Sequence, residues 1–466
     1  MSRLIVVSNR VNPPKAKGDE TVGGLAMALS AALREYSGIW FGWSGKTTPE
    51  FTGQLNMEHF DGVTVATVDL EEVDLHEYYN GYANKTLWPL FHYRQDLVAY
   101  DRSFNEGYQR VNRRFAETLR PLIQPDDLIW VHDYHLIPLA CALRALGVKN
   151  KIGFFLHIPW PAHQLLVTLP KHREMVQAVL DYDLVGFQTA EHRKAFEDYV
   201  LSEVEGGLVA EDHVRAFGRK VQVGVYPIGI DFKEFSELAD NDRAWRLHDI
   251  MAAHTMFRQL IVGVDRLDYS KGLEERFLGF EHFLAQNPDL RREVLMLQIA
   301  PISRESVDAY QEIRARLDSL SGRINGEYAD VDCNPIRYVN KNHRRDELAG
   351  VYRAARVGLV TPLRDGMNLV AKEFIAAQSP EDPGVLILSR FAGAAHQLKD
   401  ALLINPNSPE EISDALKRAL SMDKAERIRR WRALHDNVRR EDVTAWRDAF
   451  VGDLQGIGEG RTALAS

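Results

Sequence analysis

Short runs of Val, Ile and Leu recur along the chain, separated by stretches in which apolar residues fall three or four positions apart. The short runs do not alternate apolar with polar positions, which is typical of parallel strands that helices cover on both faces. The longer stretches have the spacing of one helix face, as at Val307, Tyr310 and Leu317. The pattern predicts strands at 4–8, 39–43, 63–70, 128–132, 152–157, 184–188, 260–264, 294–299, 336–339, 358–361, 385–388 and 402–404.

Strands and helices in alternation predict an α/β protein with doubly wound parallel sheets. A Pro- and Gly-containing stretch at 225–231 separates two such series, so we expect domains at 1–229 and 230–440, each with its own sheet. We expect residues 441–466 to form a helix that packs back on the first domain, followed by a frayed tail. Ligands of such sheets bind at the carboxyl ends of the strands, so the active site should lie in a cleft between two facing domains.

Composition narrows the class of protein. The net charge of -9 over 466 residues argues against a nucleic-acid partner, because phosphate backbones select basic faces. No apolar run reaches the ~18 residues of a membrane helix, and the first residues predict a strand rather than a signal peptide. We therefore expect a cytoplasmic protein with no membrane partner. The apolar helical run around Cys141 predicts a buried structural thiol, and with Cys333 the chain has only two cysteines.

Several common motifs are absent. Gly45, Lys46 and Thr47 resemble the end of a phosphate-binding P-loop, but Trp40 stands where that motif requires glycine. No G-x-G-x-x-G follows a strand, which argues against a dinucleotide-dependent dehydrogenase. His132 and His135 do not have the spacing of a zinc site, so we expect neither a metal nor a cofactor.

Two segments are candidates for binding an anion. Gly23 and Gly24 precede a predicted helix, and Arg10 ends the first strand, so backbone amides and a guanidinium would meet at the ligand edge of the sheet. Arg266 and Lys271 follow a later strand and could stabilise a departing diphosphate. The alternatives are an ordinary glycine turn and a surface loop with salt bridges to neighbouring aspartates.

A third segment, 361–373, has a strand end, a turn and a helix start near Asn368. The free amides of that helix start could bind the same diphosphate, and Glu373 could accept hydrogen bonds from a ribose diol. The alternative is a capped helix with Glu373 in solvent. Elsewhere, Tyr79 and Trp88 could form an aromatic wall for a sugar ring, and His157 could donate to a glucose hydroxyl. For these three residues the alternative is a place in the core.

Taken together, the segments at 78–94, 129–135, 153–159, 265–278, 297–304 and 358–373 resemble the retaining, two-domain family of trehalose-6-phosphate synthases. The resemblance runs from residue 3 to about residue 455. It implies the GT-B architecture of two facing Rossmann-like domains. It also implies transfer of glucose from UDP-glucose to glucose 6-phosphate with retention, giving α,α-trehalose 6-phosphate and UDP.

The resemblance also implies roles for individual residues. The acceptor site would contain Arg10, Tyr79, Trp88, Asp133 and Arg304, with the two arginines on the phosphate. Trp88 and Ile158 would select the anomer. The nucleotide sugar would be bound by Gly23, Gly24, Arg266, Lys271, His343, Leu369, Val370, Ala371, Lys372 and Glu373. The residues expected to act in catalysis are Arg266, Lys271, Asp133, His157 and Asp365.

Two rival functions stay open at this point. A sibling enzyme could use another phosphorylated acceptor, such as glycerol 3-phosphate, because the Arg10 and Arg304 clamp fits either acceptor. A catalytically silent sugar-phosphate sensor is the second rival, and the presence of Arg266, Lys271, Asp365 and Glu373 argues against it. The expected partners are the donor and acceptor sugars, and a homo-oligomer, a dimer or a tetramer, is a further possibility.

Overall fold

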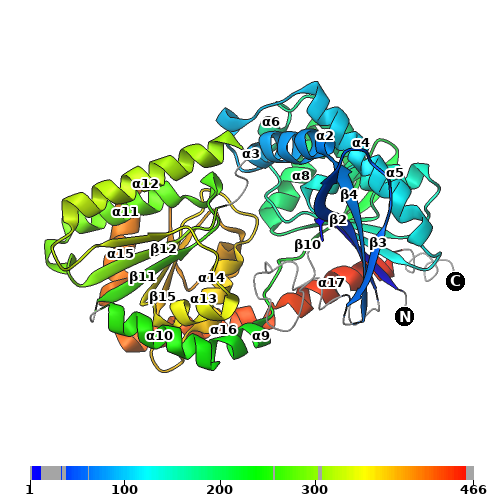
Figure 1. The fold of residues 1–466 in the computed structure, drawn as a ribbon. Helices are drawn as coiled ribbons and strands as arrows, with labels where there is room; N and C mark the ends of the chain where they lie inside the picture. Colours follow the sequence, from blue (N-terminus) through cyan, green and yellow to red (C-terminus); the bar gives the residue numbers. More distant parts are fainter. Residues whose placement is uncertain are drawn as a thin grey trace. The chain divides into compact units, whose positions relative to one another are not determined.

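The computed structural model describes residues 3–11, 33, 38–60, 62–255, 258–302 and 307–457. The chain divides into two compact units. The first contains the described residues up to Pro227 together with those from Thr444 onward, and the second is Ile228–Val443. The tail was expected at 456–466, and its residues 458–466 lie outside the described residues. Each unit is an α/β structure with its own sheet (Figure 1), which confirms the predicted fold class.

The first unit contains a sheet of ten strands in the order β3-β4-β2-β1-β5-β6-β7-β10-β9-β8. Seven of them, from β4 to β10 in that order, are parallel, and the strands at both edges are antiparallel. The strands are β1 (Leu4–Arg10), β2 (Ile39–Thr48), β3 (Asn56–Phe60), β4 (Val63–Glu71), β5 (Leu128–His132), β6 (Ile152–Phe155), β7 (Leu184–Phe187), β8 (Gly207–Ala210), β9 (His213–Ala216) and β10 (Arg219–Val225).

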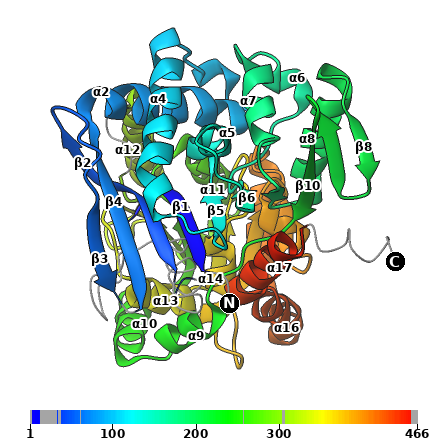
Figure 2. The ribbon, with the colours of Figure 1, turned by 90° about the vertical axis from the view of Figure 1, so that its right-hand side faces the viewer.

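Helices cover this sheet on both faces (Figure 2). The segment around Tyr79 is a π-helix, η1, that continues into α3. The helical elements of the unit are α2 (Glu72–Asp74), η1 (Leu75–Leu87), α3 (Trp88–Phe91), η2 (Gln95–Leu97), α4 (Arg102–Leu119), η3 (Arg120–Leu122), η4 (Tyr134–Leu136), α5 (Leu139–Ala145), α6 (His163–Leu166), α7 (His172–Val179), α8 (Ala190–Glu203) and α17 (Val443–Gly456).

Helix α17 comes from the far end of the sequence and packs against the first sheet. Its Phe450 ring stacks on Trp130 of β5, with 4.8 Å between ring centroids. Gly153 of β6 and Gly186 of β7 make room for that ring, since a Cβ atom at either position would lie 2.7–2.8 Å from it. Tyr226 donates a hydrogen bond to Asp453. Residues separated by about 300 positions therefore share one core.

The second unit has six strands, all parallel, in the order β13-β12-β11-β14-β15-β16. This is the 3-2-1-4-5-6 order of a doubly wound sheet, whose strand order reverses between β11 and β14. The strands are β11 (Gln259–Val264), β12 (Val294–Ile299), β13 (Ile336–Val339), β14 (Val357–Val360), β15 (Val385–Ser389) and β16 (Leu402–Ile404). All six strands predicted for this unit are present, with ends shifted by no more than one residue.

Two groups of helices enclose this sheet. Helix α11 packs with α12 and α15, and α13 packs with α10 and α14 (Figure 1). The helical elements of the unit are α9 (Phe232–Ala239), α10 (Asp242–His254), η5 (Tyr269–Lys271), α11 (Leu273–Gln286), η6 (Pro288–Leu290), α12 (Asp308–Tyr328), α13 (Arg345–Ala354), α14 (Leu369–Ala377), η7 (Gly393–His396), α15 (Pro409–Ser421) and α16 (Lys424–Arg440). Within the described ranges, no helix is both long enough and apolar enough to cross a bilayer.

Candidate functional site

Two loops meet at the switch point of the second sheet, one after β11 and one after β14. Lys271 belongs to the first loop and Asp365 to the second, and Lys271 Nζ lies 2.5 Å from Asp365 Oδ2. Arg266, in the same loop as Lys271, is exposed. In a doubly wound sheet the switch point is the usual ligand site. The structure thus brings together, at that point, residues expected to bind the donor or to act in catalysis.

The loop after β11 is fixed to the end of β14. Gly272 closes the loop with a positive φ of 61°, and a Cβ atom there would lie 2.0 Å from the carbonyl oxygen of Thr361. Thr361 Oγ1 donates to the Gly272 carbonyl at 3.0 Å, and Leu363 N donates to the Ser270 carbonyl at 2.8 Å. Glycine is therefore required at position 272, both for its backbone conformation and for the close approach of the two loops.

Arg276 connects the strand ends that carry both loops, and it was not among the residues predicted for the site. Its side chain is fully buried and donates to Asp265 at 2.7 Å, to Gln298 at 2.8 Å and to Thr361 Oγ1 at 3.0 Å. Those three partners stand at or next to the ends of β11, β12 and β14. Burial raises the pKa of Asp265, and the nearby guanidinium opposes that rise. A buried arginine with three partners is a rigid brace for strand ends.

Helix α14 begins next to Asp365. Asn368 has a positive φ of 91°; its Oδ1 accepts from the backbone N–H of Ala371 at 3.0 Å, and its Nδ2 donates to Asp365 Oδ2 at 3.1 Å. The cap satisfies one of the first amides of the helix, and the N–H groups of Leu369 and Val370 have no acceptor within the helix. This helix start therefore has two amides available for an anion beside the Lys271–Asp365 pair.

Lys372 and Glu373, in the first turns of α14, differ in burial and in their partners. Lys372 is fully buried and its Nζ donates to the Ile228 carbonyl and to Gln397 Oε1, both at 2.7 Å, so its side chain is occupied within the second unit. Burial lowers its pKa to about 7. Glu373 is half-buried, and burial raises its pKa to about 7 against the opposing effect of Arg345. His343 lies just before α13, with Nδ1 3.5 Å from Glu347 Oε2.

The strand order of the first sheet reverses between β1 and β5, and residues expected to bind ligands lie at the ends of both strands. Arg10 ends β1, and its guanidinium lies 5.7 Å from the centre of the Trp43 ring and against Gly45. The ring of Tyr79 lies on from Trp43, with its centre 5.6 Å from the centre of the Trp43 ring and 5.9 Å from that of the His135 ring. Within the part of the chain that the structure describes, no carboxylate pairs with Arg10. A cation beside aromatic faces suits a phosphorylated sugar.

Asp133 and His157 connect the ends of β5 and β6. Asp133 has a positive φ of 76°, and its Oδ1 accepts from the backbone N–H of His157 at 3.2 Å. Trp88 and Ile158 are 5% and 6% exposed, and the Trp88 ring lies 5.7 Å from that of Tyr134. These residues therefore gather at the carboxyl edge of the first sheet. Gly23, Gly24 and Arg304 lie outside the described residues.

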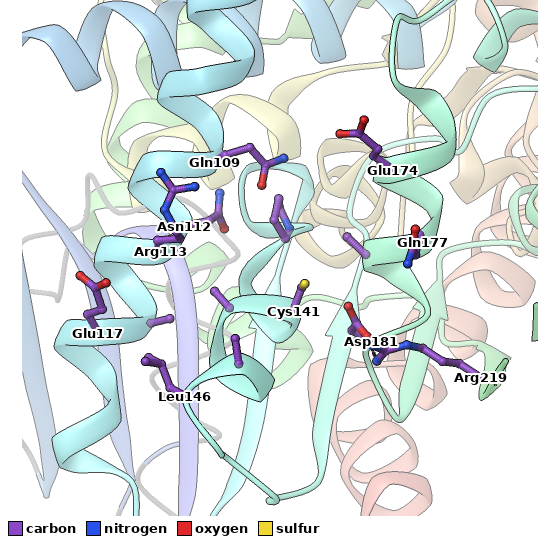
Figure 3. A pocket seen from close by; sticks show the side chains of 15 residues that line it. Gln109, Asn112, Arg113, Glu117, Cys141, Leu146, Glu174, Gln177, Asp181 and Arg219 are labelled. Atoms are coloured by element: carbon purple, nitrogen blue, oxygen red, sulfur yellow. Dashed lines mark ion pairs between the residues drawn. The ribbon is translucent and has the colours of Figure 1, made fainter. Parts of the chain in front are cut away.

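The prediction of a buried thiol at Cys141 is wrong. Cys141 is exposed, because it lies on the side of α5 that faces away from the sheet. It lines a cavity of about 460 Å³ between α4, α5 and α7, whose lining includes four alanines and polar side chains such as Gln109, Glu117 and Gln177 (Figure 3). That cavity contains none of the residues expected to bind donor or acceptor.

Among the described residues, no cluster of three or more His, Cys, Asp or Glu side chains is arranged to hold a metal.

Comparison with known proteins gives one consistent result. The sequence model of glycosyltransferase family 20 matches residues 2–456. A trehalose-6-phosphate synthase from Sinorhizobium fredii is 48% identical over 97% of this chain and 98% of its own length. A crystal structure of an α,α-trehalose-phosphate synthase (UDP-forming) from Burkholderia xenovorans, in complex with glucose-6-phosphate, is 51% identical, with a TM-score of 0.94 over 98% of this chain and 100% of that one.

A structure from E. coli bound with UDP-2-fluoro glucose is 46% identical, with a TM-score of 0.94 over 98% of this chain and 99% of that one. The match extends over nearly the whole length in each comparison, so it includes both sheets and the loops at their switch points. The chain belongs to glycosyltransferase family 20.

Proposed function

We propose that this chain transfers glucose from UDP-glucose to glucose 6-phosphate with retention, giving α,α-trehalose 6-phosphate and UDP. The observation that carries the proposal is the Lys271–Asp365 contact at the switch point of the second sheet, next to the start of α14. Relatives matched over nearly their whole length are trehalose-6-phosphate synthases, and the one from Burkholderia xenovorans is UDP-forming. One of them was solved with glucose-6-phosphate and another with UDP-2-fluoro glucose.

The second unit would bind the donor. Arg266 and Lys271 would neutralise the diphosphate, and the amides of Leu369 and Val370 would add hydrogen bonds and the positive end of a helix dipole. Glu373 would accept hydrogen bonds from the ribose diol in its ionised form. Asp365 would turn from Lys271 to the hydroxyl groups of the donor glucose.

The first unit would bind the acceptor. Arg10 would pair with the phosphate of glucose 6-phosphate, helped by Arg304. Tyr79 and Trp88 would pack on the sugar ring, and Asp133 would accept a hydrogen bond from one of its hydroxyls. An aromatic wall of this size favours a hexose over the smaller glycerol 3-phosphate.

The chemistry follows from these placements. The bond between donor C1 and the diphosphate oxygen breaks, and C1 passes through an oxocarbenium-like state. The anomeric hydroxyl oxygen of the acceptor bonds to C1 on the same face, and its proton passes to the departing phosphate oxygen. Arg266 and Lys271 stabilise the charge that develops on the leaving diphosphate, and that charge is larger in the transition state than in the ground state. Holding both sugars in place supplies much of the remaining rate enhancement.

An assay with separate donors and acceptors tests the proposal. Purified protein is incubated with UDP-, ADP- or GDP-glucose and with glucose 6-phosphate or glycerol 3-phosphate, and products are identified by NMR. We expect α,α-trehalose 6-phosphate and UDP from the reaction of UDP-glucose with glucose 6-phosphate. Preferential use of glycerol 3-phosphate would make the chain the sibling enzyme. Binding of sugar phosphate without any turnover would make it a sensor. Sedimentation velocity measures whether the protein forms a homo-oligomer, a dimer or a tetramer.

A further inference from the structure

His132 and His157 stand at the ends of neighbouring parallel strands, and their rings share one hydrogen bond. His132 is the last residue of β5, and His157 lies two residues beyond the end of β6. Nδ1 of His132 lies 3.0 Å from Nε2 of His157. Only one of these two nitrogens can carry the shared proton, so this contact links the tautomers of the two rings.

The shared proton lies either on His132 Nδ1 or on His157 Nε2, and the environment of His132 Nε2 decides between the two. His132 is 1% exposed, and its Nε2 is buried without a hydrogen-bond partner. Its surroundings are aromatic, with the Trp130 ring at 4.5 Å and the Phe155 ring at 6.4 Å between centroids. A buried N–H without an acceptor is less well tolerated than a buried acceptor without a donor. The favoured tautomer of His132 therefore has its proton on Nδ1, and Nε2 is unprotonated.

The consequence for His157 follows directly. If His132 Nδ1–H donates to His157 Nε2, the single ring proton of a neutral His157 must sit on Nδ1. Both rings are neutral at physiological pH, because burial lowers the pKa of His157 to about 3 and holds that of His132 well below its usual value. Nδ1 of His157 makes no hydrogen bond within the described residues. It is thus a donor available to a ligand at the carboxyl edge of the first sheet.

Helix α17 closes the apolar side of this pair. The ring of Trp446 lies 6.1 Å from each imidazole, between centroids, and is 3% exposed. Trp446 comes from the end of the chain, more than 280 residues after His157 in sequence. Its ring adds to the aromatic surroundings in which His132 Nε2 is buried without a hydrogen-bond partner.

We propose that His132 is a positioning residue that holds His157 in the Nδ1–H tautomer, so that His157 donates a hydrogen bond to an oxygen of a bound hexose. The identity of the ligand rests on the proposed function. The tautomer is a property of the ligand-free protein and is tested separately. His132 itself touches no substrate and acts only through His157.

Long-range 1H–15N correlation spectra of ligand-free protein with 15N-labelled histidine measure the tautomer. The His157 signals are assigned by their loss in His157→Gln. We expect a pyrrole-type Nδ1 and a pyridine-type Nε2 for His157, and the same pattern for His132. A proton on Nε2 of His157, or an average of both tautomers, overturns the proposal whatever the enzyme's substrate.

Two variants of His132 then test its effect on binding. His132→Phe keeps a ring but removes the donor, whereas His132→Asn places an amide N–H close to the position of Nδ1. In His132→Phe we expect about tenfold weaker binding of UDP-glucose, the effect of one hydrogen bond between neutral groups, and unchanged binding of UDP. His132→Asn should restore most of the affinity. If His132→Phe does not fold, His132→Asn and the spectra carry the test.

The matched control is His172→Phe. His172 lies in the same unit, hydrogen-bonded to Tyr199 and outside every residue set proposed to bind substrate. It should leave the ratio of UDP-glucose to UDP affinity unchanged. Equal weakening of UDP and UDP-glucose in His132→Phe, or no recovery in His132→Asn, would indicate a merely structural role and overturn the proposal. Failure of the wild-type protein to bind UDP-glucose would contradict the proposed function and leave the tautomer result standing.

Discussion

Lys271 Nζ lies 2.5 Å from Asp365 Oδ2, although the two residues are 94 positions apart in the sequence. Each side chain is only 13% exposed, so the pair is largely shielded from water. In the proposed reaction Lys271 binds the diphosphate and Asp365 binds the donor glucose. The ligand-free protein thus keeps its cation satisfied with a carboxylate from the same site, and donor binding must replace that contact.

Replacement of Lys271 tests the electrostatic part of this account. In Lys271→Ala we expect kcat to fall about 10²- to 10³-fold or more, because one preorganised charge on the departing diphosphate is lost. The melting temperature should stay near that of the wild type. Lys194→Ala is the control, since Lys194 is an exposed lysine paired with Asp198 on α8, and its activity should not change. Near-normal turnover in Lys271→Ala would refute the assignment.

Arg276 should matter for stability more than for chemistry. In Arg276→Met we expect the free energy of unfolding of the second unit to fall by about 3–5 kcal/mol, because Asp265 is left as an unpaired buried charge. The double variant Asp265→Asn with Arg276→Met should recover part of that loss. Urea-induced unfolding followed by fluorescence measures both. Equal destabilisation of the single and double variants would assign the effect to the lost contacts with Thr361 and Gln298 instead.

Glu373 predicts a pH dependence of nucleotide binding. Burial raises its pKa to about 7, so at pH 6 most of the free protein carries the protonated form. A ribose diol donates to the carboxylate and favours its ionised form, so affinity for UDP should rise between pH 6 and pH 8 and binding near pH 7 should release protons.

Isothermal titration calorimetry in buffers of different ionisation enthalpy measures this proton release. The comparison is made between wild type, Glu373→Gln and the exposed control Glu381→Gln, which corrects for the titration of UDP itself. Glu373→Gln should lose its share of the release, and Glu381→Gln should behave like the wild type. Identical proton release in all three proteins would remove Glu373 from the nucleotide site.

The packing of Phe450 on the first sheet implies that the end of the chain contributes to the stability of the first unit. Phe450→Ala should destabilise the first unit by about 3–5 kcal/mol, because Gly153 and Gly186 have no side chains to fill the space that the ring leaves. Met57→Ala, at a position 46% exposed, serves as the control and should change stability little. Thermal unfolding of both variants measures the difference. A near-neutral Phe450→Ala would show that α17 contributes little to the first core.

Most of the buried parallel strands could be predicted from the sequence because their apolar runs are continuous. Strands β3, β8, β9 and β10 were not predicted. The first three are antiparallel strands of four or five residues at or next to the edges of the sheet, such as His213–Ala216. Strand β10 (Arg219–Val225) is parallel to β7, but it mixes polar with apolar residues and has no continuous apolar run. The π-helical geometry of η1 was also beyond prediction, since its spacing near Tyr79 resembles that of an ordinary helix. Short edge elements depend on pairing with a neighbour more than on their own sequence.

For the site, the sequence could indicate which residues end strands but not which of them would meet. Aspartates near Lys271 in the sequence were one alternative partner, yet Asp265 pairs with Arg276 and Lys271 pairs with Asp365. Those contacts depend on the order of strands in the sheet, which places β11 beside β14. Arg276 was missed because an arginine on an amphipathic helix gives no signal that it is buried.

A crystal structure of the protein soaked with UDP tests the central claim most directly. The account predicts the diphosphate oxygens within hydrogen-bond distance of Lys271 Nζ and of the amides of Leu369 and Val370, the ribose hydroxyls on Glu373, and an opened Lys271–Asp365 pair. UDP bound away from these residues, or bound there with the 2.5 Å Lys271–Asp365 contact intact, would contradict it.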